Sequence, residues 1–275
     1  MAKGLGIIGN FKGKVGNIVG YNLKDSNNKQ TQGLRAYQPV VRNPKTSRQA
    51  EQRAKMAPIN ATYRALKGII DRGQEGVVYG NKSRLRFLSE AMKQFNGPWF
   101  EKGDAVTLPI KTNITRGSLP AVSIDGVTGQ KLGTNLSIGS TTTIATVGAM
   151  ATALLANNSF LKEGDQLTFI HGSIEHVSIV SVVLNPSSTD AVSNFTVSGG
   201  SLGFQPSVSA PNVGAFGCVV ISREGDNGQH LRSTTALSLS EVTAADTHYT
   251  STAKNAAIES YMAANGITDW PEEQL

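Results

Sequence analysis

The chain has 275 residues, of which 39% are hydrophobic, and it carries a formal net charge of +6 and a single cysteine. One cysteine excludes an intrachain disulfide framework and a multi-cysteine zinc site, and it is typical of a protein made in a reducing cytoplasm. No run of about 18 apolar residues is present, so we predict no membrane-spanning helix. The 29 glycines favour a loop-rich fold with much β-structure, in one large domain or two ordinary ones.

The net charge conceals two halves of opposite sign. Residues 1–102 contain 19 Lys and Arg against 6 Asp and Glu, a net charge of +13, whereas residues 103–275 contain 7 against 14, a net charge of −7. A basic half can hold the phosphates of nucleic acid, and it can equally hold the acidic half of a neighbouring copy. The second alternative needs no further partner and suits a protein that assembles head to tail.

The first residues contain a glycine pattern that resembles a phosphate-binding loop. Gly4, Gly6 and Gly9 satisfy G-x-G-x-x-G, and Gly13-Lys14 resembles the end of a Walker loop. No helical period follows, however, and Val15 stands where a Walker loop has the Ser or Thr that binds magnesium. We therefore predict no nucleotide and no other cofactor here. We expect an extended or hairpin segment that buries its apolar face against the rest of the chain or another subunit.

Residues 1–45 are predicted to form an extended basic arm. Asn27-Asn28 suits a turn between two short extended pieces, and Pro39 and Pro44 forbid a helix after them. We expect little pairing within the last part of the arm, and an arm of this kind is ordered when it lies on another chain. The predicted contacts with another subunit are Phe11, Lys12, Lys14, Ile18, Arg35 and Arg42.

Residues 46–103 are predicted to form a basic helical hairpin. The first helix begins at a capping box headed by Thr46, and Pro58 should kink or divide it. The second helix is capped by Ser83 and stops at Gly97-Pro98. The apolar stripes that define the two helices are Met56, Ile59, Tyr63, Leu66 and Ile70 in the first, and Leu85, Leu88, Met92 and Phe95 in the second.

The other faces of these helices are basic and are candidate contacts for DNA phosphates. Modules that read bases usually add aromatic platforms or a recognition helix. Here Tyr63 and Phe87 fit the interface between the helices better than a platform. Three alternatives stay open: phosphate contact without base reading, a solvated charged face, and a face for an acidic protein. The candidate phosphate contacts are Arg48, Arg53, Arg64, Arg84 and Arg86.

Residues 104–275 are predicted to form an acidic, β-rich domain. Short apolar runs alternate with Gly, Asn, Asp and Ser turns, which is typical of an antiparallel β-sandwich or small barrel. The Ala-rich stretch 142–158 is predicted to be an inserted helix, and a C-terminal helix should begin at Thr250 or Ser251. The predicted fold class is therefore α+β: an arm, a helical hairpin and a mainly antiparallel β-domain.

Few residues suggest catalysis. His171, Glu175 and His176 surround one turn, but a spacing of i, i+5 across a hairpin is not that of a helical metal-binding pair, and solvated turn histidines explain them as well. Cys218 lies in an apolar run and is expected to be a buried strand thiol. No serine is marked as activated. We predict no metal site and no enzyme, and a hydrolase that uses His171 and His176 is the third hypothesis.

Two stretches resemble a known family. GIIGNFKGKVGNIVGY, followed by RAYQPVVRNPKTSRQAEQR, is similar to the N-terminal signature of small uncharacterised proteins of Bacteroidota and their phages. VVISREGDNGQHLRSTTALSL resembles the closing strands of that family, in which a Ser-Arg turn precedes a Leu-Arg-Ser-Thr run. The signature residues present here are Gly9, Phe11, Gly13, Lys14, Gly16, Asn43, Pro44, Thr46, Gln49 and Arg53.

The resemblance covers about the first 70 residues and about 25 near the end, and it implies no chemistry. Some relatives resemble virion proteins of crAss-like phages, including proteins that form rings around the neck and tail. The resemblance thus implies a structural virion protein, made in the bacterial host cytoplasm, that forms a homo-oligomeric ring beside other phage structural proteins. The alternative is a basic protein associated with nucleic acid.

Overall fold

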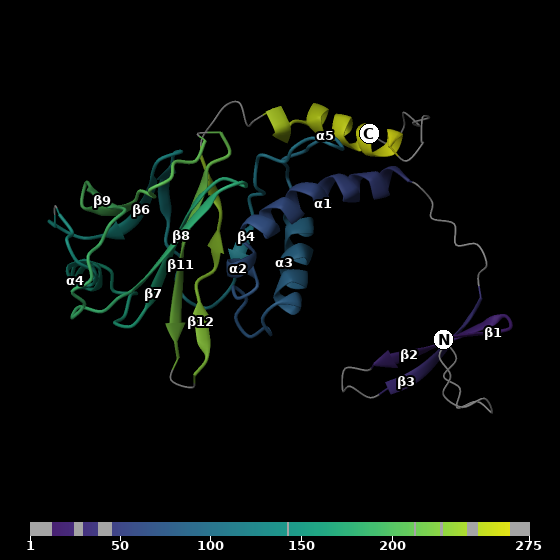
Figure 1. The fold of residues 1–275 in the computed structure, drawn as a ribbon, viewed down its shortest axis with the longest axis horizontal. Helices are drawn as coiled ribbons and strands as arrows, with labels where there is room; N and C mark the ends of the chain where they lie inside the picture. The colour runs from purple at the N-terminus through teal and green to yellow at the C-terminus, as the bar shows by residue number, and fades with distance from the viewer. Residues whose placement is uncertain are drawn as a thin grey trace. The chain divides into compact units, whose positions relative to one another are not determined.

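The computed structural model describes residues 13–24, 30–37, 46–141, 143–211, 213–225, 228–240 and 247–264. It divides the chain into two units, Met1–Pro44 and Lys45–Leu275, which we describe separately. The described residues form five helices and fourteen strands, and every sheet is antiparallel (Figure 1). The fold class is therefore α+β, as predicted.

The first unit is a three-stranded sheet in the order β1-β2-β3, with β1 at Gly13–Val15, β2 at Ile18–Lys24 and β3 at Gln30–Ala36. Gly16, with a φ of +56°, begins the two-residue turn between β1 and β2, a position that hairpins give to glycine. Ile18 faces Ala36 in the register of β2 and β3.

The expectation of little pairing in the last part of the arm is wrong for residues 34–36, which pair with β2. Strands β2 and β3 are paired from Ile18 and Ala36 at one end to Lys24 and Gln30 at the other, so they satisfy each other's backbone groups. The predicted turn at Asn27-Asn28 and the two prolines, Pro39 and Pro44, lie outside the described residues.

The second unit begins with α1 (Ser47–Ala65) and the short α2 (Lys67–Ile70). Thr46 caps α1 as predicted, because its side chain accepts a hydrogen bond from the backbone N–H of Gln49 at 3.4 Å. Of the two effects expected of Pro58, a kink or a division of the helix, the division does not occur. The helix continues through Pro58, which is buried in its packed face, and the break comes at Leu66 instead. Packing of the buried face thus outweighs the one backbone bond that proline removes.

Helix α3 (Asn81–Gln94) differs from the prediction in both its start and its buried face. It begins after Gly80, and the Ser83 hydroxyl lies inside the helix and donates to the carbonyl of Val78 at 3.3 Å. Ser83, Phe87 and Ala91 form the buried face, whereas Leu85 is 57% exposed. The helix is rotated so that Phe87 packs near Tyr63, with ring centroids 6.4 Å apart. The predicted stripe was therefore wrong at Leu85.

A helix from the other end of the sequence also packs on α1. Helix α5 (Ser251–Ala263) is capped by Thr250, one of the two predicted caps, and it runs beside α1 (Figure 1). Ala50 and Ala54 of α1 belong to the small buried clusters that also contain Ala257 and Ile258 of α5. Alanine on both helices allows this close approach.

Two open sheets and a short two-stranded ribbon follow, and no closed barrel is formed by the described strands, so the sandwich is the alternative that is observed. The predicted inserted helix is α4 (Val147–Asn157). The four-stranded sheet has the order β5-β6-β10-β9, the five-stranded sheet has β12-β11-β7-β8 with β14 beside β11, and β4 pairs with β13. The strands are β4 (Asn113–Thr115), β5 (Ile124–Val127), β6 (Leu132–Ser137), β7 (Gln166–Gly172), β8 (Val177–Val183), β9 (Phe195–Ser198), β10 (Ser201–Phe204), β11 (Phe216–Glu224), β12 (His230–Arg232), β13 (Thr235–Ala236) and β14 (Ser238–Leu239).

Strand β11 is buried on both faces. Val219 and Ile221 pack in the cluster shared with the four-stranded sheet and α4, whereas Cys218 and Val220 pack in the cluster shared with α1, α2 and α3. Cys218 is 0% exposed, as expected for a strand thiol, and burial raises its pKa well above the ordinary value. Because the helices and the sandwich share this strand, no gap in packing separates residues 46–103 from the residues that follow.

A buried ion pair fixes the start of β7 against β11. The carboxylate of Asp165, 0% exposed, accepts hydrogen bonds from Nε and Nη2 of Arg223 at 2.6 and 2.7 Å, and from the backbone N–H of Lys162 at 2.8 Å. Arg223 Nη2 also donates to the carbonyl of Phe160 at 2.9 Å. Its partner Asp165 raises the pKa of Arg223, so the guanidinium stays charged.

We expect Asp165→Asn to lower the free energy of unfolding by about 3 kcal/mol, because it leaves a largely buried guanidinium without its counter-charge. Urea unfolding followed by circular dichroism measures this. The matched control is Glu163→Gln, which makes the same change of charge at an exposed neighbour and should cost less than about 0.5 kcal/mol. Equal effects of the two substitutions would show that the ion pair does not stabilise the fold.

Candidate functional site

Four arginines line one hollow of the Lys45–Leu275 unit, with a volume of about 780 Å³. Arg72 follows α2, Arg86 lies on α3, Arg116 follows β4 and Arg232 ends β12. Residues 74–79, the loop between α2 and α3, form another part of the wall. The hollow is therefore built jointly by the helical segment and the β-rich segment.

Backbone hydrogen bonds hold these pieces together. The N–H of Glu75 donates to the carbonyl of Arg116, and the N–H of Arg116 donates to the carbonyl of Gly73, both at 2.9 Å. The carbonyl of Arg232 accepts from the N–H of Leu119 at 2.9 Å. The α2–α3 loop, the chain after β4 and the end of β12 thus form a continuous hydrogen-bonded wall.

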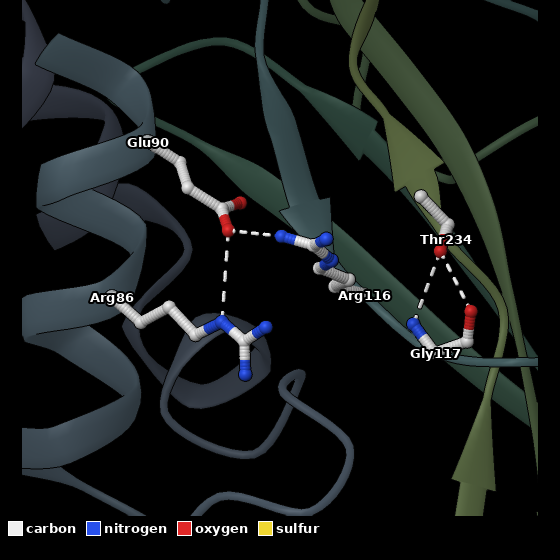
Figure 2. A network of polar contacts seen from close by, with 5 residues as sticks. All are labelled: Arg86, Glu90, Arg116, Gly117 and Thr234. Carbon is white, nitrogen blue, oxygen red and sulfur yellow. Dashed lines mark hydrogen bonds and ion pairs between the residues drawn. The ribbon is translucent and has the colours of Figure 1, made fainter. Parts of the chain in front are cut away.

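Two glycines permit this close approach. A Cβ on Gly117 would lie 2.1 Å from the carbonyl oxygen of Arg232, and one on Gly73 would lie 2.7 Å from Cγ2 of Thr115. The backbone at Gly117 also bonds Thr234, whose Oγ1 accepts from the Gly117 N–H at 3.1 Å and donates to its carbonyl at 2.8 Å (Figure 2). A larger residue at either glycine would separate the elements that carry the arginines.

Glu75 links the same three pieces through its side chain. Its Oε2 accepts hydrogen bonds from the backbone N–H groups of Ser118 at 2.9 Å and Arg232 at 3.1 Å, and its Oε1 accepts from the Ser118 hydroxyl at 3.0 Å. Burial alone would raise the pKa of Glu75. The hydrogen bonds from Ser118 and Arg232, together with the Arg232 charge, outweigh burial and hold the pKa of this carboxyl below its ordinary value.

A second carboxylate orients two of the arginines. Glu90 Oε1 pairs with Nη1 of Arg116 and lies 3.6 Å from Nε of Arg86, so one oxygen serves both guanidinium groups (Figure 2). Arg232 is held by the backbone carbonyl of Arg72, which accepts from its Nε at 2.7 Å, and by a hydrogen bond from its Nη1 to the hydroxyl of Ser222.

The charges of this site do not cancel. Four arginines face the carboxylates of Glu75 and Glu90, which leaves a formal surplus of two positive charges. The guanidinium of Arg72 has no hydrogen-bond or ion-pair partner among the residues that the structure describes. The hollow therefore presents unused donors and positive charge to a ligand.

Of the five predicted phosphate contacts, only Arg86 lines this hollow. Arg48 and Arg64 are exposed on α1, and Arg53 is half-buried there. The guanidinium carbon of Arg84 lies 5.1 Å from the centroid of the Tyr63 ring, so this side chain is engaged with its own fold.

Arg72, Arg116 and Arg232 were not among the residues predicted from the sequence. Arg72 and Arg116 each precede one of the glycines, Gly73 and Gly117, that the close approach requires. That repeated Arg-Gly pair was the available signal. The signal can be interpreted only once β4 is known to pair with β13, and no local sequence pattern predicts that pairing.

The predicted arm contacts fall only partly within the described residues, since Phe11, Lys12 and Arg42 lie outside them. Lys14 Nζ lies 3.5 Å from the centroid of the Tyr37 ring, and the guanidinium carbon of Arg35 lies 6.0 Å from that of Tyr21, as in cation–π contacts within the unit. Ile18 is 44% exposed.

The two histidines considered for a metal have different environments. His171 is 0% exposed in β7, whereas His176 and Glu175 are exposed. The expectation of a solvated turn was therefore wrong for His171, because β7 is covered on both faces. Its Nε2 lies 2.7 Å from the carbonyl oxygen of Thr128, so Nε2 carries the proton. The described residues contain no group of three His, Cys, Asp or Glu side chains placed to hold a metal.

No protein-family model matches the chain, and the comparisons with curated proteins and with solved structures find no significant match. In the part of the chain that the structure describes, none of the helices combines the length and the apolar character needed to cross a bilayer.

We expect Glu75→Gln to lower the free energy of unfolding by about 2 kcal/mol at neutral pH, because hydrogen bonds to a carboxylate are replaced by weaker ones to an amide. The folded-state pKa lies below the ordinary 4.5, so the carboxylate stabilises the fold above pH 4.5 and this contribution is lost as the pH falls through the folded-state pKa. The difference between wild type and variant should therefore shrink in acid. Urea titrations at several pH values measure it, with exposed Glu101→Gln as the control.

The burial of His171 predicts that the free energy of unfolding also depends on pH nearer neutrality, below pH 6.5. Burial lowers its pKa below the ordinary 6.5, and the hydrogen bond to Thr128 only partly opposes this. The unfolded chain then binds a proton that the folded chain does not, so the free energy of unfolding should fall as the pH drops below 6.5, by up to about 1.4 kcal/mol per pH unit. His176→Gln should leave this slope unchanged. A wild-type stability that is flat between pH 7 and pH 5.5 would contradict the assignment.

Proposed function

We propose that the chain is a structural subunit that assembles with copies of itself, in the neck or tail of a bacteriophage virion as the resemblance suggests. One observation supports this most strongly: the three-stranded sheet of residues 13–37 leaves four of its large apolar side chains exposed. The exposed fractions are 54% for Val15, 44% for Ile18, 37% for Leu34 and 37% for Tyr37.

This unit gains little from its own burial. Among its side chains that the structure describes, none of the large apolar ones is buried, and the buried positions are the two glycines Gly20 and Gly33. A three-stranded sheet is stable when a hydrophobic face is covered. We infer that another surface supplies the cover for β1, β2 and β3.

Charge favours an acidic surface as the cover. Residues 1–44 contain 7 Lys and Arg against a single Asp, a net charge of +6, whereas residues 103–275 have a net charge of −7. When the basic unit of one copy contacts the acidic part of the next, the two contacting surfaces differ. Such heterologous contacts close into rings when the rotation between copies allows it.

The alternative function, a basic protein associated with nucleic acid, is favoured by the arginine-lined hollow. A protein of this kind does not need to assemble with copies of itself, so the sheet of residues 13–37 would not be required for assembly. Oligomeric state therefore separates the two.

We expect the purified chain to form a defined oligomer by native mass spectrometry, and Val15→Ser, Ile18→Ser and Leu34→Ser together to dissociate it. Loss of about 1 kcal/mol of apolar burial at each position should weaken each contact about a hundredfold. The matched control replaces three similarly exposed residues of the other unit by Ser and should leave the oligomer intact: Leu85, Val183 and Val208, which are 57%, 50% and 60% exposed.

A wild-type chain that stays monomeric, or a triple variant that still assembles, would contradict the proposal. Equal dissociation by the control triple would show that the sheet has no special part in assembly. Deletion of residues 1–44 should abolish the oligomer while the remaining unit keeps one cooperative melt, because that unit has its own core. Negative-stain images of the wild type then show whether the oligomer is a ring.

A further inference from the structure

We propose that the arginine-lined hollow binds the phosphate of a nucleotide, either free or within single-stranded nucleic acid. The inference stands on the geometry of the Lys45–Leu275 unit and does not depend on self-assembly. The shared ligand chemistry is a phosphate ester next to a planar base.

The arginines are arranged as a preformed anion site. Arg86 and Arg116 come from opposite walls and converge on Glu90 (Figure 2), while Arg232 is held by the Arg72 carbonyl and by Ser222. Side chains that are already oriented lose little freedom when a ligand binds. Three of the four arginines, Arg86, Arg116 and Arg232, are therefore oriented before the phosphate arrives.

Donors remain after these internal bonds are made. A guanidinium has five N–H groups, and only Nη1 of Arg116 and Nε of Arg86 are directed at Glu90. Arg116 is 54% exposed through its side chain, and Arg72 has no side-chain partner among the described residues. A phosphate group can accept two parallel hydrogen bonds from each guanidinium. Arg72 and Arg116 are thus the expected phosphate ligands.

The same hollow offers a place for a base. Tyr79 is 50% exposed and Val78 is 66% exposed, and both line the wall that carries Arg72. Aromatic rings beside a basic groove are the usual platforms for stacked bases. Gln74, 2% exposed, also lines the hollow, and its buried Oε1 has no hydrogen-bond partner within the described part of the chain.

Size and wall composition favour a nucleotide over an acidic peptide. The volume of about 780 Å³ lies in the range of about 300–1,000 Å³ that is typical of small-molecule sites. Carboxylates of a peptide would satisfy the arginines, but they would leave the exposed Tyr79 ring without a partner of matching shape. A nucleotide can contact both, with its phosphate at the arginines and its base at the Tyr79 ring.

The test is binding of a fluorescein-labelled single-stranded DNA of about twelve thymidines to the full chain, followed by anisotropy at about 50 and about 150 mM salt. We expect binding that weakens with salt, and Arg72→Gln should weaken it about tenfold, the effect of losing one guanidinium–phosphate contact. Arg72 is the best choice because its guanidinium holds no other described residue, so the variant should keep the wild-type melting temperature.

The matched control removes two arginines outside the hollow. Arg48→Gln and Arg64→Gln, both exposed on α1, should each leave the affinity within about twofold, because they change net charge equally but not the site. Tyr79→Ser should weaken binding about tenfold whereas Tyr79→Phe should not, because stacking needs the ring and not the hydroxyl.

Competition identifies the source of the phosphate. Adenosine monophosphate or triphosphate that displaces the labelled strand at similar concentrations indicates a free nucleotide, and displacement only by unlabelled strand indicates single-stranded nucleic acid. Inorganic phosphate alone should compete weakly because it lacks the base. Four results would overturn the proposal: no binding at low salt, wild-type affinity of Arg72→Gln, equal weakening by the α1 variants, or displacement by a poly-glutamate peptide as effective as by DNA.

Discussion

Burial of β11 on both faces is the constraint on which the rest of the Lys45–Leu275 unit depends. Successive side chains of a strand point to opposite faces, so Val219 packs on the side of the four-stranded sheet and Val220 packs on the side of the helices. Gly217 lets the layers approach, since a Cβ there would lie 2.5 Å from Cδ1 of Leu132. One strand therefore fixes the helices against the sandwich. The chain segments after α2, after β4 and in β12 are hydrogen-bonded to one another, and together with α3 they bring four arginines to one hollow.

The polar interactions at the hollow follow from the same packing. A wall made of loop and strand ends has backbone donors that the sheets do not satisfy, and Glu75 supplies acceptors for two of them, at Ser118 and Arg232. Glu90 then orients Arg116 beside Arg86. Both carboxylates make structural contacts, but two carboxylates offset only two of the four arginine charges, so the arginines are only partly neutralised. The positive potential is a consequence of how the wall is held together.

Periodicity and capping predicted much of this fold because they act over a few residues. Thr46 and Thr250 cap their helices as expected, the inserted α4 lies where the Ala-rich stretch placed it, and the alternation of short apolar runs with turns gave antiparallel sheets. The errors come from contacts between distant residues. Helix α3 is rotated to bury Phe87 beside Tyr63 in place of Leu85, and His171 is buried because β7 receives a layer on each face. Arg116 and Arg232 meet only through pairing of strands that are far apart in sequence, so no local pattern could join them.

The contrast between the opening glycines and the hollow shows why a phosphate motif needs its structural context. The Gly13-Lys14 pair that resembles a Walker loop lies in β1, where Lys14 lies over Tyr37, and Gly16 adopts a positive φ in the hairpin turn that follows. A Walker loop works because a helix follows it and directs backbone N–H groups at the phosphates, and here a strand follows. The hollow has no recognisable motif, yet it gathers guanidinium groups from four places along the chain, and one of them, that of Arg72, has no partner among the described residues. Phosphate binding is therefore better supported at the arginine-lined hollow, where tertiary packing concentrates positive charge, than at the glycine pattern near the start of the sequence.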